Sequence, residues 1–158
     1  MNNELHFSNK SDEWSTPQAF YDKLDNKYKF VFDLAASKEN CKTEDGFTKE
    51  ENALDQNWAL ITYESIEQGM SGWLWCNPPY SMCKEFVDKA YGEMLMGAKI
   101  IMLIPSRTDT RYFHDFIYKK EGVSFQFVKG RLKFGDSKNA APFPSMLVKF
   151  DLEQNNII

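Results

Sequence analysis

The sequence predicts a single α/β domain built on a layered, mostly parallel sheet. Apolar runs alternate with amphipathic segments along most of the chain, as they do when helices connect parallel strands. The clearest strand is 99–104, which ends in five consecutive apolar residues and is bounded by Gly97 and Pro105, a pattern typical of burial on both faces. The last two predicted strands, 124–128 and 145–150, have no helix between them, which predicts an antiparallel pair at the sheet edge.

The first part of the chain is predicted to hold a helix followed by a strand. Residues 1–10 are polar, and we expect them to be flexible. Thr16 can cap a helix and Pro17 suits the first helical position, so a helix is predicted over 16–26. The mostly apolar run at 29–36 predicts the first buried strand.

The remaining elements are predicted from apolar periodicity and from the positions of Gly and Pro. They are a strand or a helix at 58–66 after the weakly patterned residues 38–57, a strand at 73–76, a helix at 82–96, a helix capped by Thr108 or Thr110 that carries Tyr112, Phe113, Phe116 and Ile117, and a short strand at 132–134 within a loop at 130–144.

Composition excludes several classes of protein. The 158 residues are 42% hydrophobic and 15% aromatic, which is enough for one domain with a core over 1–158. No apolar run approaches the ~20 residues of a membrane span. The opening residues 1–4 lack the basic and apolar regions of a signal peptide, so we expect no membrane association.

The cysteines and histidines predict neither disulfides nor a metal site. Cys41, Cys76 and Cys83 are odd in number, and their spacing fits no zinc pattern. His6 and His114 lie far from them in the sequence. We therefore expect reduced thiols, a cytoplasmic location and no metal.

Charge is divided unevenly along the chain. The net charge is −4, yet residues 97–149 hold ten Lys and Arg against four Asp and Glu. A polyanion such as DNA would therefore meet the basic C-terminal half. A solvated basic face without a ligand explains the same distribution.

Asn77, Pro78, Pro79 and Tyr80 form the most informative motif, because they lie between the predicted strand at 73–76 and the next helix. Ligands bind at the carboxyl ends of strands in α/β sheets. Two prolines hold the backbone extended and donate no N–H, which leaves a rigid turn with carbonyls, a side-chain amide and a ring. Such a turn is suited to gripping a planar amine. The structural alternative is a stiff loop with Tyr80 packed at its rim.

With five other segments, this motif resembles the phage-type DNA N6-adenine methyltransferase family. The similarity runs from about Glu13 to Phe150. The segments that carry it are Trp14-Ser15-Thr16-Pro17, Asp33-Leu34-Ala35-Ala36-Ser37, Asn77-Pro78-Pro79-Tyr80, the stretch from Leu103 to Arg111, Gly130-Arg131-Leu132-Lys133-Phe134, and Ala141-Pro142-Phe143-Pro144-Ser145-Met146.

The resemblance implies the fold of S-adenosylmethionine-dependent methyltransferases, a mostly parallel seven-stranded sheet with helices on both faces. It also implies a source in a phage or a prophage-bearing bacterium, and hence a bacterial or phage-infected cytoplasm. By the same resemblance, Asn77 and Pro78 hold the target amine, Pro79 completes the motif, and Tyr80 stacks on the target base.

The resemblance also implies a set of cofactor-binding residues near the first helix and the first strand. They are Trp14, Thr16 and Pro17 at the methionine end, Asp33, Ala35, Ala36 and Ser37 in the loop after the first strand, and Asp55 facing the adenine or ribose.

Two departures from the family pattern bear on the fold and the cofactor. The loop over 33–37 contains no glycine, although its two alanines are small enough for close approach to a ligand. Only 43 residues separate Asp33 from Asn77, which would cramp two further strand–helix units, so an abridged sheet is expected on that side. No separate target-recognition domain is evident.

Five basic residues of the C-terminal half are candidates for DNA phosphate contacts: Arg107, Arg111, Arg131, Lys133 and Lys138. Alternatively, Arg107 and Arg111 pair with Asp109.

Two other functions stay open. One is a methyltransferase that acts on RNA adenine or on a glutamine amide. The other is a catalytically inactive phage protein that binds DNA or a host protein. Recognition sequence, oligomeric state and biological role, anti-restriction or regulatory, are not determined by the sequence.

Overall fold

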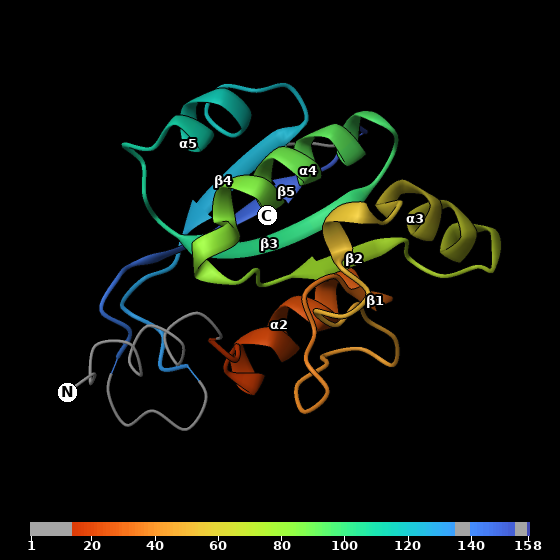
Figure 1. Cartoon of the computed structure of the whole chain (residues 1–158), viewed down its shortest axis with the longest axis horizontal. Coiled ribbons are helices and arrows are strands. Elements are labelled where there is room, and N and C mark those ends of the chain that lie inside the picture. Colours follow the sequence, from red (N-terminus) through yellow and green to blue (C-terminus); the bar gives the residue numbers. More distant parts are fainter. Residues whose placement is uncertain (1–13, 135–139, 154–157) are drawn as a thin grey trace.

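A mixed five-stranded sheet forms the centre of the protein. The computed structural model describes residues 14–134, 140–153 and 158 (Figure 1). The strands are β1 (Phe32–Asp33), β2 (Trp73–Cys76), β3 (Lys99–Pro105), β4 (Val123–Phe127) and β5 (Ser145–Phe150), arranged in the order β1-β2-β3-β5-β4. β1, β2 and β3 are parallel, and β5 runs antiparallel to both β3 and β4. The predicted α/β class and the antiparallel edge pair are confirmed.

Helices cover both faces of the sheet. α2 (Gln18–Tyr28) lies on one face, whereas α3 (Trp58–Glu67), α4 (Cys83–Leu95) and α5 (Arg111–Phe116) pack on the other (Figure 1). Two short 3-10 turns, η1 (Ala53–Asp55) and η2 (Tyr80–Met82), precede α3 and α4. Each face therefore has its own hydrophobic core.

β3 is the strand that both cores share. Successive side chains of a strand point to opposite faces, so Ile100, Met102 and Ile104 join the core under α4. Ile101 and Leu103 join the core under α2. All five side chains are at most 2% exposed, which explains why this strand is an unbroken apolar run instead of an alternating one.

The structure corrects two predicted elements and decides between the alternatives for a third. The predicted strand at 29–36 contains only the two residues of β1, although Val31 and Leu34 still donate backbone hydrogen bonds to β2. Of the two alternatives for 58–66, the helix is correct, since Asn57 caps it by accepting from the Leu60 N–H at 3.0 Å. No strand forms at 132–134.

The helix predicted over 16–26 begins two residues later, at Gln18, and ends at Tyr28. Pro17 is the N-cap and Thr16 does not cap, because its hydroxyl is used elsewhere in the fold. α5 is also shorter than predicted, and the Thr110 hydroxyl donates to the Arg107 carbonyl instead of capping. Residues 1–10, expected to be flexible, lie outside the described residues.

The segment between Asp33 and Asn77 supplies α3 and β2, but it adds no full strand to the outer edge of β1. Its residues 45–47 run parallel to β1 and form a single bridge, between Asp33 and Gly46. The Asp33 N–H donates to Asp45, and the Phe47 N–H donates to Asp33. The sheet thus ends beside β1 in a single bridge to Asp33. Asp33 is also the first residue of the predicted cofactor loop over 33–37.

We expect Gly46→Ala to destabilise the protein. A Cβ at this position would lie 2.7 Å from the Cys41 Sγ, 2.8 Å from the Asp33 carbonyl oxygen and 3.0 Å from the Ala36 Cβ. Such overpacking should lower the free energy of unfolding by about 1–3 kcal/mol. Urea denaturation of the variant and the wild type measures this difference.

Gly92→Ala is the matched control, because a Cβ there meets no atom within 4 Å and the residue lies within α4. Ala in place of Gly in a helix raises stability by about 0.5–1 kcal/mol. Equal effects of the two substitutions would contradict close packing at Gly46.

Candidate active site

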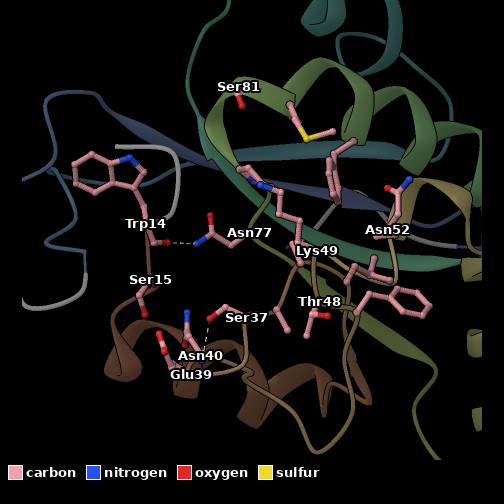
Figure 2. Close-up of a pocket in the computed structure, with 18 residues that line it drawn as sticks. Trp14, Ser15, Ser37, Glu39, Asn40, Thr48, Lys49, Asn52, Asn77 and Ser81 are labelled. Carbon is pink, nitrogen blue, oxygen red and sulfur yellow. Dashed lines mark hydrogen bonds between the residues drawn. The ribbon is translucent and has the colours of Figure 1, made fainter. Parts of the chain in front are cut away.

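A cavity of about 460 Å³ opens at the carboxyl ends of β1 and β2 (Figure 2). The residues directly after the two strands, 34–37 and 77–82, form its base. Residues 39–53, the irregular segment that follows the β1 loop, form one wall. The lining residues are Trp14, Ser15, Leu34, Ala35, Ala36, Ser37, Glu39, Asn40, Phe47, Thr48, Lys49, Asn52, Ala53, Asn77, Pro79, Ser81, Met82 and Phe86. Its volume lies within the range of small-molecule and cofactor sites, about 300–1,000 Å³.

Asp33 shapes the loop beneath this cavity without lining it. Its carboxylate is 3% exposed and accepts backbone hydrogen bonds from Ala35 at 3.1 Å and from Lys42 at 3.0 Å. Burial raises the pKa of this carboxyl, and the two backbone N–H groups and the Lys42 charge oppose that effect. The carboxylate therefore fixes the glycine-free loop by bonding two backbone segments at once.

Asn77 is held at the edge of the cavity by its side-chain nitrogen. The Nδ2 donates to the backbone carbonyl of Trp14 and, at 3.0 Å, to the Oγ1 of Thr16. A carbonyl only accepts hydrogen bonds, so this partner identifies the amide nitrogen and places the oxygen on the opposite side. Figure 2 shows the nitrogen pointing toward Trp14 and the oxygen pointing away from it. Among the described residues, no donor bonds the Asn77 oxygen.

The two prolines after Asn77 differ in exposure and in hydrogen bonding. Pro78 is buried, and within the described part of the chain its carbonyl accepts no backbone hydrogen bond. The Pro79 carbonyl accepts from the Met82 N–H at 3.0 Å and thereby closes η2. The Pro79 carbonyl is thus used by the fold, whereas the Pro78 carbonyl takes no part in the described backbone hydrogen bonds.

Tyr80 lies in a cluster of four aromatic rings beside the motif. Its ring centroid is 4.5 Å from that of Phe143 and 6.0 Å from that of Trp14, and the Trp14 ring also meets Phe134 and Phe143 edge-on. Burial raises the pKa of the Tyr80 hydroxyl far above neutral pH, against a smaller opposing effect of Arg107. Tyr80 therefore contributes a neutral ring.

The structure brings together most of the site residues named from the sequence. Trp14, Ala35, Ala36, Ser37, Asn77 and Pro79 line the cavity. Five more lie within three positions of these residues in the chain but do not line the cavity: Thr16, Pro17, Asp33, Pro78 and Tyr80. Asp55 is exposed outside the cavity, where its carboxylate accepts at 2.8 Å from the side chain of Asn52, which does line it.

Twelve of the eighteen residues that line the cavity were not named as site residues from the sequence. The missed residues include Phe47, Thr48, Lys49 and Asn52, which come from a polar segment with weak structural signals. Phe143 was quoted within a family segment but was given no role, and its contact with Tyr80 is seen only in the fold.

The predicted phosphate-contacting residues lie exposed on two segments. Arg107 and Arg111 flank the turn between β3 and α5, and Arg131 and Lys133 lie in the segment that ends at Phe134. Lys138 is outside the described residues. No ion pair joins Arg107 or Arg111 to Asp109, because the one salt bridge among the described residues is Lys89–Glu93.

The residues that the structure describes form neither a metal-binding cluster nor a membrane-spanning helix. No group of three or more His, Cys, Asp or Glu side chains there is placed to hold a metal ion. None of the described helices has the length and apolar character needed to cross a membrane.

The sequence of this chain is similar to those of known proteins. A family model described as DNA N-6-adenine-methyltransferase (Dam) matches residues 5–153. A protein of Escherichia phage T1 named DNA N-6-adenine-methyltransferase is 36% identical over 103 residues, which cover 65% of this chain but only 39% of the phage T1 protein. A protein of the same name from Haemophilus phage HP1 (strain HP1c1) is 27% identical over 152 residues, covering 90% of this chain and 81% of that protein. The chain belongs to the DNA N-6-adenine-methyltransferase (Dam) family.

Proposed function

We propose that this chain transfers a methyl group from S-adenosylmethionine to the N6 amino group of adenine in DNA. The observation that carries the proposal is the orientation of Asn77, whose amide oxygen is turned away from the two protein groups that hold its nitrogen. An acceptor at the end of a parallel strand, beside a cavity of cofactor size, matches what an exocyclic amine requires.

We further propose that the domain is an abridged methyltransferase fold. Its sheet is mostly parallel, carries helices on both faces, and has one reversed strand next to the edge strand. The described residues form five of the seven strands that the family resemblance implies, and the shortening falls beside β1.

The cavity residues suit S-adenosylmethionine in shape and in chemistry. Leu34, Phe47 and Phe86 provide apolar surface for a base, and Ser37 and Asn40 provide polar groups nearby. Ala35 and Ala36 keep the loop after β1 narrow, as a backbone that approaches a ligand requires. When bound, the cofactor supplies an electrophilic methyl group.

Asn77 and Pro78 would activate the acceptor by hydrogen bonding. The lone pair of an aromatic amino group is delocalised into the ring, which makes the nitrogen a poor nucleophile. The Asn77 oxygen and the Pro78 carbonyl would accept its two hydrogens, localise the lone pair and aim it at the methyl group. The nitrogen would bond the methyl carbon as the carbon–sulfur bond breaks, S-adenosylhomocysteine would leave, and one proton of the methylated amino group would pass to solvent. Catalysis would then come from positioning and electrostatics, with no strong base needed before transfer.

The aromatic cluster would hold the target base outside the DNA helix. An enzyme that acts on a base in duplex DNA extrudes it into a pocket. Tyr80 and Phe143 lie nearly perpendicular, at 86°, so a base stacked on one ring would meet the other edge-on. Arg131 and Lys133 would contact phosphates beside this pocket, because their segment ends at Phe134, which packs against Trp14.

We expect Asn77→Ala to abolish methyl transfer while leaving S-adenosylmethionine binding within about twofold of wild type, because only the acceptor is removed. The assay is transfer from labelled S-adenosylmethionine to unmethylated DNA, with mass spectrometry of the digested nucleosides. Cofactor affinity is measured by calorimetry.

Asn26→Ala, at an exposed position of α2, is the control for this substitution. Loss of cofactor binding in step with activity would contradict the role given to Asn77. A wild-type protein that binds the cofactor but labels RNA or a protein glutamine would move the proposal to those acceptors. Binding without any transfer would indicate an inactive relative.

Tyr80→Ala should lower the methyl-transfer rate by roughly 5- to 150-fold, the equivalent of the ~1–3 kcal/mol of one base–aromatic stack. Tyr80→Phe keeps the ring and should keep the rate and its dependence on pH, since the raised pKa leaves the hydroxyl neutral throughout the assay range. Tyr63→Ala, with 62% of that residue exposed on α3, is the control. A rate lost equally in the Phe and Ala variants would show that the hydroxyl, not the ring, is needed.

Replacing both Arg131 and Lys133 by Ala should weaken DNA binding equally for all sequences, and should reduce the slope of log K against log salt by about two. Lys27 and Lys119 are the matched control pair, because both precede strands and therefore lie at the amino end of the sheet, away from the cavity. Fluorescence anisotropy at several salt concentrations gives the slopes. An unchanged slope in the first variant would exclude these two residues as phosphate contacts.

A further inference from the structure

We infer that Thr16 is a positioning residue for Asn77 and not a contact to the cofactor. Its hydroxyl oxygen accepts a hydrogen bond from the Asn77 Nδ2 at 3.0 Å, next to the bond that this nitrogen makes with the Trp14 carbonyl. Together the two acceptors hold the amide in the orientation that aims its oxygen at the target amine. This inference rests on the proposed function for the identity of that amine.

Burial separates Thr16 from the cofactor cavity. Thr16 is only 3% exposed and is absent from the cavity lining, whereas its neighbours Trp14 and Ser15 do line it. A side chain so enclosed cannot reach a ligand there without a rearrangement of the segment. Its hydrogen bond to Asn77 is the polar contact through which it can affect the reaction.

The orientation of the amide decides whether Asn77 attracts or repels the target amine. One end of an asparagine side chain is an acceptor and the other carries two donors. With the nitrogen held by the protein, the oxygen faces the amine hydrogens. Turned over, the amide would present donors to donors. The two acceptors satisfy both hydrogens of the nitrogen. Turning the amide over would face its oxygen to the Trp14 carbonyl, which only accepts, and would force the Thr16 hydroxyl to donate instead of accept.

The segment that holds the amide is itself fixed at both ends. On one side, the Trp14 ring packs against Tyr80, Phe134 and Phe143. On the other side, the Pro17 carbonyl accepts from the first N–H groups of α2, at Phe20 and Tyr21. Thr16 therefore lies between the aromatic cluster and the start of α2. Because both ends of this segment are fixed, the Thr16 hydroxyl holds the Asn77 side chain in a defined position.

NMR tests the hydrogen bond without cofactor or DNA. The side-chain amide signals of Asn77 are assigned by their loss in Asn77→Ala. In the wild type, their exchange with water should be slow; in Thr16→Val, which keeps the shape but removes the acceptor, it should be at least about fivefold faster. Thr16→Ser should restore slow exchange. Thr16→Ala serves the same purpose if the valine variant does not fold. Unchanged exchange in the folded variant would overturn the inference.

Kinetics then tests the consequence for the reaction. Thr16→Val should lower kcat by roughly tenfold and leave the Kd of S-adenosylmethionine and the KM for DNA within about twofold, whereas Thr16→Ser should recover most of kcat. Thr62→Val is the matched control, because Thr62 is 2% exposed and its hydroxyl donates to the Gly72 carbonyl at 2.9 Å, remote from the cavity. The Thr62→Val variant should have a lower free energy of unfolding than the wild type but an unchanged kcat.

Two results would overturn the inference. A loss of cofactor affinity in proportion to kcat would make Thr16 a cofactor contact. A serine variant as slow as the valine variant would show that the hydroxyl is not responsible. Absence of methyl transfer by the wild-type protein on every acceptor would refute the proposed function instead, while the NMR result would still decide the role of Thr16.

Discussion

The site depends on the hydrogen bonds that join Asn77 to residues 61 and 63 positions earlier in the chain. The sheet brings Asn77 to the end of β2, but strand geometry alone does not decide which way its amide turns. The Trp14 carbonyl fixes this orientation because it can only accept, and the Thr16 hydroxyl accepts from the same nitrogen and holds the side chain in place. The aromatic cluster and α2 in turn hold this segment in place. The proposed catalytic acceptor is thus held by two distant parts of the sequence.

The second support of the site is the carboxylate of Asp33, buried under the cavity. The loop over 33–37, which we propose contacts the cofactor, contains no glycine. Here the carboxylate bonds the backbone of Ala35 and of Lys42, while Gly46 provides the close approach between segments. The raised pKa shows that burying this charge has a cost, which its two backbone hydrogen bonds offset only in part. The carboxylate stabilises the narrow loop that a shortened sheet leaves beside β1.

The parts of the fold that could be predicted from the sequence are those governed by local rules. β3 was evident because burial on both faces makes every residue apolar, and Asn77 could be placed because its motif follows such a strand. The cavity wall around Thr48 and Asn52 could not be predicted, because long-range contacts fix this irregular segment. Thr16 has the pattern of a helix cap, yet its hydroxyl bonds a residue far along the chain. Asp55 was assigned by family resemblance, and the fold places it behind Asn52 instead of in the cavity.

The central claim is that the Asn77 oxygen is the acceptor for the target amine while its nitrogen stays bound to the Trp14 carbonyl. A crystal structure at atomic resolution, with S-adenosylhomocysteine and an adenine-containing oligonucleotide, tests this claim most directly. The account predicts the N6 of one extruded adenine within hydrogen-bonding distance, about 2.7–3.2 Å, of the Asn77 oxygen, with the base stacked against Tyr80. An adenine bound elsewhere, or an amide turned so that its oxygen faces Thr16, would contradict it.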